Sequence, residues 1–264
     1  MSSSPPPSPP RRRIVGVSTK MYFSAARTKH YIQELLQIIS SSSPSSSDLL
    51  SQLDIFIIPD HITLASVASQ LAGTSILTGA QDAFYEDSGA FTGEVSPAVL
   101  AEVGCRIVEL GHAERRRLFH ETDADAARKA AAAARNGMIP LVCIGERTRI
   151  DNTTTAAVEE CRPQVEAVLA AVPSDADVIL AYEPVWAIGA AEPAGADYVV
   201  AVTRQLRNLE CVRQRQGATR ILYGGSAGPG LFEKLKDGVD GLFLGRFAHD
   251  PAQFYRTILE VAAA

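Results

Sequence analysis

The segment DVILAYEP (residues 177–184) is an apolar run that ends on a glutamate and a proline. Seven further segments have the same short, β-rich and largely apolar character, namely 14–19, 54–59, 75–80, 106–110, 139–144, 219–224 and 240–245. Near-continuous apolar runs are typical of strands that are buried on both faces, as in parallel sheets. Longer helical stretches separate these runs, such as the alanine-rich residues 124–136 that end at Asn136-Gly137. The pattern predicts eight parallel strands with crossover helices.

Eight such units in a chain of 264 residues are the signature of a (β/α)8 TIM barrel, which routinely forms a single domain at this length. An open, doubly wound sheet is the alternative fold, but it usually has fewer strands and a GxGxxG motif after the first strand, where this sequence has none. We expect one catalytic barrel domain over residues 14–264. Residues 1–13 (MSSSPPPSPPRRR) are expected to form a disordered tail, with a weak organelle-targeting role as the alternative.

Charge and composition argue against several classes of protein. The net charge is -5 and the basic residues form no continuous face, so we expect no nucleic-acid partner. No apolar run reaches the roughly 18 to 20 residues of a membrane helix, so we expect no membrane contact and a cytoplasmic location. The cysteines, which are Cys105, Cys143, Cys161 and Cys211, lack paired spacing. They indicate reduced thiols and neither a disulfide nor a metal site.

Three chemically capable residues follow strand ends. Lys20 follows the run 14–19, His112 follows 106–110, and Glu183 follows 177–182. In (β/α)8 barrels the carboxyl ends of the strands form the active site, so we expect these side chains to meet there. Each has a simpler interpretation, because Lys20 could be a surface lysine, His112 a helix cap, and Glu183 the partner of an arginine. Their joint occurrence at strand ends favours the catalytic interpretation.

A carboxylate, an imidazole and a fixed cation around one cavity suit proton transfer next to a carbonyl group. We expect Glu183 to remove the carbon-bound proton, while His112 and Lys20 stabilise the resulting enediolate oxygen. The sequence GHAERR (111–116) predicts a short helix, whose amide groups and dipole should keep His112 neutral. This chemistry needs neither a metal nor an organic cofactor.

Two glycine-rich turns follow the last two predicted strands. They read YGGSAGPG (223–230) and LGRFAHDP (244–251), and each is expected to precede a helix. Bare backbone amides and a helix N-terminus can bind a dianion, and barrels commonly place a phosphate site here. The alternative is that both are ordinary tight turns. The pair of turns favours a phosphorylated substrate.

Taken together, these motifs resemble the triosephosphate isomerase family from Val15 to Ile258. The segments that carry the resemblance are ELGHAERR (109–116), AYEPVWAIG (181–189), YGGS (223–226) and GAFTGEVS (89–96). In that family a glutamate base, a neutral histidine and a closing sixth loop divide the work, and this family is a standard example of that division. The resemblance implies a homodimeric isomerase of triose phosphates that acts in glycolysis and gluconeogenesis.

The resemblance also assigns roles to single residues. It implies catalysis by Glu183, His112 and Lys20, substrate binding by Lys20, Ser18, Gly189, Ser226, Gly245 and Arg246, support by Glu114 and Tyr223, and dimer contacts by Thr92, Gly93 and Glu94. Glu183 would lie where the strand gives way to an apolar lid, and Tyr223 and Ser226 would hydrogen-bond the closed lid. Lid closure would remove water from the carboxylate and strengthen it as a base.

Several positions depart from the family pattern. Ser18 and Thr19 stand where an asparagine and a tryptophan are usual, Ala113 replaces a serine, and Arg246 replaces a glycine; the lid's second hinge, Ala190-Ala191-Glu192, lacks glycine. Some of these features resemble the tetrulose-4-phosphate isomerases of erythritol catabolism. A four-carbon substrate is therefore the main alternative to the triose. A phosphate-site barrel lyase or synthase and a barrel that has lost activity and only binds a partner are the others.

Overall fold

The computed structural model describes residues 12–43, 48–149, 154–188 and 194–264. Its centre is a closed barrel in which each strand pairs with the next and β8 pairs with β1. The strands are β1 (Arg13–Ser18), β2 (Leu53–Ile58), β3 (Ile76–Ala80), β4 (Ile107–Leu110), β5 (Ile139–Ile144), β6 (Val178–Tyr182), β7 (Thr219–Tyr223) and β8 (Gly241–Leu244). All of the pairings are parallel. The predicted (β/α)8 barrel is confirmed.

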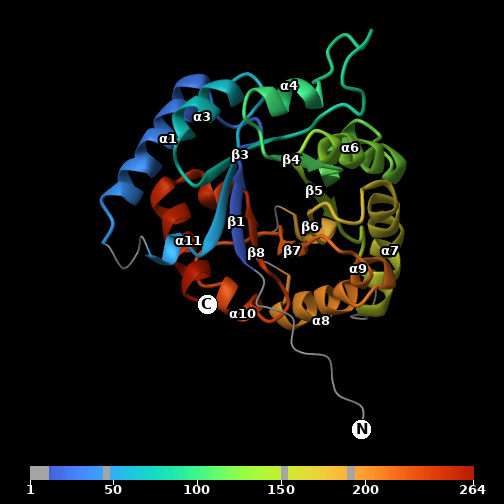
Figure 1. The fold of residues 1–264 in the computed structure, drawn as a ribbon. Coiled ribbons are helices and arrows are strands. Elements are labelled where there is room, and N and C mark those ends of the chain that lie inside the picture. The colour runs from blue at the N-terminus through green and yellow to red at the C-terminus, as the bar shows by residue number, and fades with distance from the viewer. Residues whose placement is uncertain (1–11, 44–47, 150–153, 189–193) are drawn as a thin grey trace.

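Helices surround the barrel (Figure 1). The longer ones are α1 (Ala25–Ser40), α3 (Leu64–Leu71), α6 (Asp123–Arg135), α7 (Thr154–Ala171), α8 (Ala196–Arg207) and α11 (Pro251–Ala263). The shorter ones are α4 (Pro97–Glu102), α5 (Ala113–Leu118), α9 (Glu210–Arg213), α10 (Phe232–Leu235), and the 3-10 turns η1 (Val185–Ala187) and η2 (Arg246–His249). None of the helices within the described ranges combines the length and the apolar character needed to cross a bilayer.

Local sequence accounts for where the helices begin and end. α6 begins at a capping box in which the Thr122 hydroxyl accepts from the amide of Asp125 and the Asp125 carboxylate accepts from the amide of Thr122. It ends at Arg135 with Asn136 as the C-cap, followed by Gly137 with a φ of +73°. A positive φ suits glycine, so the Asn136-Gly137 pair stops this helix as predicted.

Two apolar cores follow from the alternation of side chains along the strands. Side chains that point inward fill the barrel, and the buried ones are Ile14, Phe56, Ile58, Ile107, Leu141, Cys143, Ile179, Ala181, Leu222 and Phe243. Side chains that point outward pack against the helices in a larger second core. The filled interior leaves the ends of the barrel for polar groups, as expected for this fold.

The N-terminal boundary differs slightly from the expectation. β1 begins at Arg13 rather than at Ile14. Arg12 donates from Nε to Asp54 Oδ1 at 2.6 Å and from Nη2 to the carbonyl of Leu53 at 3.0 Å. The Arg13 guanidinium donates to the carbonyls of Lys236 and Val239. Arg12 and Arg13, the last two residues assigned to the tail, therefore belong to the barrel. Residues 1–11 lie outside the described residues.

Candidate active site

Glu183 is the first residue after β6 and lies at the carboxyl end of the barrel. Its amide donates to the carbonyl of Ile144 at 2.8 Å, and its carboxylate is buried. A Cβ atom on Gly224 would lie 2.4 Å from Glu183 Oε1, and one on Gly145 would lie 2.0 Å from the Glu183 carbonyl oxygen. Glycine at both positions lets two neighbouring turns close around the acid.

Burial decides the charge state of Glu183. Loss of water raises the pKa of Glu183 to about 8, while Lys20 opposes the rise and Glu109 adds to it. A carboxylate with such a pKa is a stronger base than an ordinary glutamate. The family resemblance implies that lid closure removes water from Glu183. In this structure, with the described part of the lid in place, only 4% of Glu183 is exposed.

His112 caps α5 and faces Glu183. Its Nδ1 accepts a hydrogen bond from the amide of Glu114 at 3.1 Å, and its Nε2 lies 3.3 Å from Glu183 Oε2. Because Nδ1 is an acceptor, the proton of the neutral ring lies on Nε2 and points into the site. Burial, followed by the charge of Lys20, lowers the pKa of His112 to about 4. The predicted neutral histidine is supported, and its role as a helix cap is part of the same arrangement.

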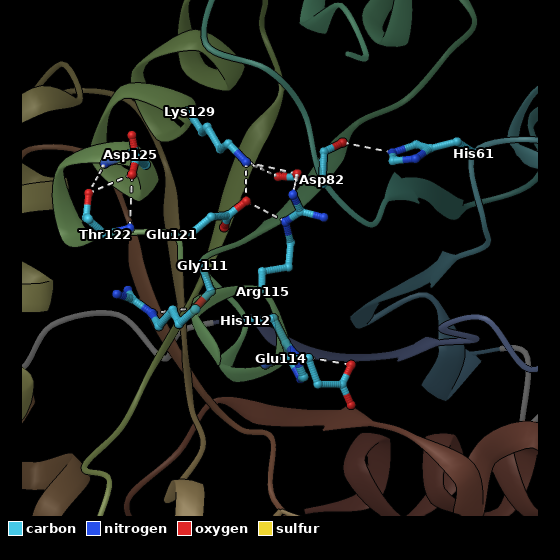
Figure 2. A network of polar contacts seen from close by, with 11 residues as sticks. His61, Asp82, Gly111, His112, Glu114, Arg115, Glu121, Thr122, Asp125 and Lys129 are labelled. Carbon is cyan, nitrogen blue, oxygen red and sulfur yellow. Dashed lines mark hydrogen bonds and ion pairs between the residues drawn. The ribbon is translucent and has the colours of Figure 1, made fainter. Parts of the chain in front are cut away.

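Lys20 supplies the cation. Its Nζ donates to Glu114 Oε1 at 2.8 Å, and its backbone adopts a φ of 48°, which is rare for a residue with a side chain. Burial alone would lower the pKa of Lys20, but the hydrogen bond and charge of Glu114, with the charges of Glu183 and Glu109, outweigh it, so the pKa is raised and the side chain stays charged. Non-glycine residues with positive φ cluster at functional sites. Figure 2 shows Glu114 beside His112, and Glu114 therefore supports both residues.

A cavity of about 510 Å³ brings the predicted residues together. Its lining includes Ser18, Lys20, His112, Glu114, Glu183, Ile188, Gly224, Gly225, Ser226, Gly245 and Arg246. A second cavity of about 600 Å³ lies on the β4 and β5 side of Glu183 and is lined by Ala113, Cys143 and Arg116 among others. The smaller cavity is the candidate active site because it contains the base, the imidazole and the cation.

The turns after β7 and β8 lie on one side of this cavity. Arg246 is exposed, lines the cavity and begins η2 directly after Gly245. The other turn also precedes a helix, α10, which begins at Phe232, and a loop separates that helix from Ser226. Backbone amides of the Gly224-Gly225 turn, without a helix N-terminus next to it, are the groups that could contact a phosphate there.

The lid segment after Glu183 is held by groups that the sequence did not single out. Glu146 is buried two residues after β5 and accepts hydrogen bonds from Trp186 Nε1 at 2.8 Å, from the Tyr182 hydroxyl at 3.0 Å and from the Tyr198 hydroxyl at 2.8 Å. The sequence signal that could have identified Glu146 is an acidic residue shortly after a strand. Glu146 therefore fixes the first half of the lid.

Three predicted residues contact or belong to the lid. The Tyr223 hydroxyl accepts from the amide of Ala194 at 3.1 Å, and the Ser226 hydroxyl lies 3.5 Å from the carbonyl of Ala187. Gly189 and the hinge residues Ala190-Ala191-Glu192 lie outside the described residues. Tyr223 and Ser226 thus contact residues that precede and follow that segment in the sequence.

The predicted dimer loop is a long excursion and not a tight turn. Residues 81–96 protrude from the barrel between β3 and α4 (Figure 1), and Thr92, Gly93 and Glu94 are exposed. Arg135 and Asn136 donate to Asp87, and the Ser96 hydroxyl donates to the Asp87 carbonyl. The loop is therefore anchored at its base and free at its tip.

Metal ligands and reactive thiols are the other groups that could carry chemistry in a barrel of this kind. Within the described ranges, no three His, Cys, Asp or Glu side chains form a set able to hold a metal ion. All four cysteines are free thiols, and burial raises the pKa of Cys105 to about 12. The thiol of Cys143 is buried beside Glu183, and burial raises its pKa too. These thiols are therefore protonated packing groups.

Comparison with known proteins agrees with this geometry. The sequence profile of the family described as triosephosphate isomerase matches residues 13–261. An L-erythrulose-1-phosphate isomerase of Pectobacterium atrosepticum is 47% identical over 91% of this chain and 92% of its own length. A protein of the same name from Rhizobium etli is 43% identical over 79% and 80%, and a probable triosephosphate isomerase 2 of Listeria monocytogenes is 36% identical over 91% and 94%. The chain belongs to the triosephosphate isomerase family and is a sugar phosphate isomerase.

Proposed function

We propose that this protein isomerises a four-carbon ketose phosphate, with L-erythrulose 1-phosphate as the substrate. The observation that carries the proposal is the arrangement of Glu183, His112 and Lys20 around one cavity in a chain that is 47% identical to an L-erythrulose-1-phosphate isomerase. The sequence alone favours the triose phosphates as first choice. The relatives support the four-carbon alternative better, because two of them at 43% identity or more have that name.

The chemistry of the substrate determines to which carbon the carbonyl group can move. In a 2-ketose 1-phosphate the oxygen on C1 is esterified, so the carbonyl group can move only toward C3. Glu183 takes the proton from C3, and the electron pair forms the C2–C3 double bond of an enediolate. Return of a proton to C2, with transfer of the hydroxyl proton from O3 to O2, leaves the carbonyl group at C3. The product is a ketose whose phosphate is on the terminal carbon farther from that carbonyl, so the reaction is a ketose–ketose shift.

The other two residues act on the oxygens. The Nε2–H of His112 donates a hydrogen bond to the oxygen on which negative charge develops, and the ammonium group of Lys20 stabilises the same charge. A neutral imidazole suits this role because its pKa of about 4 keeps it from taking the proton that Glu183 must take. The glycine turns after β7 and β8, with Arg246, hold the phosphate.

A triose phosphate substrate remains the second candidate. The relative from Listeria monocytogenes is named a probable triosephosphate isomerase 2, and the same three residues would move a proton between two adjacent carbons of dihydroxyacetone phosphate. The two candidates differ by one hydroxymethyl group at the end remote from the phosphate.

One experiment separates the two candidates. The purified full chain is offered L-erythrulose 1-phosphate and dihydroxyacetone phosphate in parallel assays, and kcat/KM is measured for each. We expect kcat/KM to be at least about tenfold higher for the four-carbon substrate. A higher value for the triose phosphate would overturn the proposal and favour a triosephosphate isomerase.

The assembly that we propose is a homodimer in the cytoplasm. The loop 81–96 supports it, since this loop protrudes, is anchored at its base and presents Phe91 with 40% of its surface exposed. An isologous pair would bury this loop on both protomers. Light scattering of the purified protein should give twice the chain mass, and Phe91→Glu should give the monomer. An active wild-type monomer at the dilution used in the assay would contradict the dimer.

A further inference from the structure

Two polar residues interrupt the apolar interior of the barrel directly below the active site. Glu109 is on β4, two residues after the inward-facing Ile107, and Ser18 ends β1. The Ser18 hydroxyl donates to Glu109 Oε2 at 2.9 Å, a bond that joins two non-adjacent strands and therefore crosses the interior. Both residues are buried, with 2% of Ser18 and 4% of Glu109 exposed.

A carboxyl group in this place lowers the stability of the fold. Removing it from water raises the pKa of Glu109 to about 7, and the hydrogen bond from Ser18 and the charge of Lys20 compensate only in part. An apolar side chain of similar size would avoid this loss, as buried ionic groups are often replaceable by hydrophobic ones. Within the described ranges, Ser18 is the one hydrogen-bond donor to Glu109, so the carboxylate keeps capacity to accept another hydrogen bond.

The position of the pair indicates which part of a substrate it could meet. The phosphate-binding turns follow β7 and β8, whereas Glu109 is on β4, across the closed barrel and three residues before His112. Ser18 itself lines the cavity of about 510 Å³. A substrate whose phosphate lies at β7 and β8 extends toward β4, and the fourth carbon of a ketotetrose 1-phosphate is at the end remote from the phosphate.

We propose that the Ser18–Glu109 pair binds the C4 hydroxyl group of the four-carbon substrate and thereby selects it over the triose phosphate. This inference rests on the proposed function. The single hydroxyl proton of Ser18 is donated to Glu109, so the lone pairs of Ser18 and the second oxygen of Glu109 are both acceptors, and the C4 hydroxyl is the matching donor. Dihydroxyacetone phosphate has no such hydroxyl and leaves these acceptors unpaired.

The test compares two substitutions on two substrates. Glu109→Leu removes the acceptor and keeps the volume, and Glu109→Gln keeps the shape but removes the charge. At pH 8.5 we expect Glu109→Leu to lower kcat/KM for L-erythrulose 1-phosphate by about tenfold or more and kcat/KM for dihydroxyacetone phosphate by less than about threefold. Glu109→Gln should give a smaller loss with the same selectivity. Ile107→Val, at the inward-facing position below Glu109, is the matched control and should change both substrates equally.

A double-mutant cycle with Ser18→Ala distinguishes a joint site from two separate effects. If the pair binds one hydroxyl group, Glu109→Gln should have little further effect on four-carbon kcat/KM once Ser18 is alanine. Equal losses on both substrates, or fully additive losses, would overturn the inference while wild-type turnover of L-erythrulose 1-phosphate still supported the proposed function. Failure of the wild-type protein to turn over that substrate would instead overturn the proposed function, and the inference with it.

Discussion

Two clusters of charged side chains share the short helix α5 and differ in how their charges are balanced. On one side Lys129 lies 2.9 Å from both oxygens of Asp82, and Arg115 of α5 lies 2.8 Å from Asp82 and also pairs with Glu121 (Figure 2). Lys129 pairs with Glu121 as well. Two cations thus meet two carboxylates in this network, which joins α6 to the segment after β3.

On the other side the charges do not balance. Three carboxylates, those of Glu109, Glu114 and Glu183, interact with Lys20, Arg117 adds a second positive charge beside Glu114, and His112 is neutral. Burial raises the pKa of Glu183 to about 8, and the charges of Glu109 and Glu114 add to the rise while Lys20 opposes it. In the compensated network burial still raises the pKa of Asp82, but Lys129 and Arg115 oppose the rise, whereas the unbalanced site holds a base at the expense of stability. Functional sites commonly lower the stability of the protein that carries them.

The largest effect is expected from Glu183→Gln, which should lower kcat by about 10² to 10⁴-fold because an amide cannot take the proton. The same substitution should raise stability at pH 9. A pKa that is 4.5 in the unfolded chain and about 8 in the fold means that the fold binds more protons between these values, so the free energy of unfolding falls as pH rises through this window.

The Glu183→Gln variant does not lose stability in this way as pH rises. Its free energy of unfolding at pH 9 should exceed that of the wild-type protein by on the order of 1 kcal/mol or more. Urea titrations at pH 5 and pH 9 measure the difference. Retention of more than a tenth of wild-type kcat would show that Glu183 is not the base. Lower stability at pH 9 would remove the contrast between the two clusters.

The converse prediction concerns Lys129. Lys129→Met leaves Asp82 and Glu121 with one cation and should lower the free energy of unfolding by about 3 to 5 kcal/mol, because an unpaired buried charge remains. The kcat of the folded fraction should change by less than about twofold. Lys236→Met, which breaks an exposed pair with Glu233, is the control and should cost less than about 1 kcal/mol. Equal losses for the two variants would show that the network is not a stabilising element.

The sequence predicts the eight strands and the catalytic residues by one rule, that capable side chains directly after apolar runs meet at the barrel mouth. The same rule could have found Glu146, which follows β5. A second rule would have been needed to identify Glu109 as a site residue, since it lies within a strand at an inward position of the run 106–110. The network could not be predicted, because Asp82 and Lys129 are 47 residues apart and no periodic pattern links them.

Arg246 adds a cation on the open side of the unbalanced site, at the phosphate turns. No hydrogen bond or ion pair joins it to Asp250 within the described ranges, and the Asp250 carboxylate instead caps α11. We expect the guanidinium group to contact the phosphate in place of a backbone amide and to shift it toward Gly245 and Ser226, which suits a longer substrate.

Arg246→Gly should therefore raise kcat/KM for dihydroxyacetone phosphate relative to L-erythrulose 1-phosphate by about tenfold, since a charged hydrogen bond contributes roughly 1.5 to 3 kcal/mol. Paired kinetics on both substrates measure the ratio. Arg246→Lys keeps the charge and should keep most of the selectivity. If Arg246→Gly changes both kcat/KM values by the same factor, the residue is a surface arginine without a role in substrate length.

The smallest predicted effect is a shift of the pH profile. The rate constant kcat/KM should rise with pH through about 8, because Glu183 must lose its proton in the free enzyme to act as a base. The substrate phosphate loses its second proton near pH 6 and does not obscure this limb of the profile. After burial and Lys20, Glu109 is the next contributor to the pKa of Glu183, and its charge raises that pKa.

Removing the charge of Glu109 should move the acidic limb to lower pH. We expect Glu109→Gln to shift its midpoint down by on the order of half a unit. Glu121→Gln is the matched variant on the other side of α5, where Lys129 and Arg115 neutralise the carboxylate, and it should leave the midpoint unchanged. If both substitutions shift the midpoint equally, α5 does not separate the two clusters electrostatically. If neither does, burial alone sets the pKa of the base, and the excess of carboxylates over cations in the site has another cause.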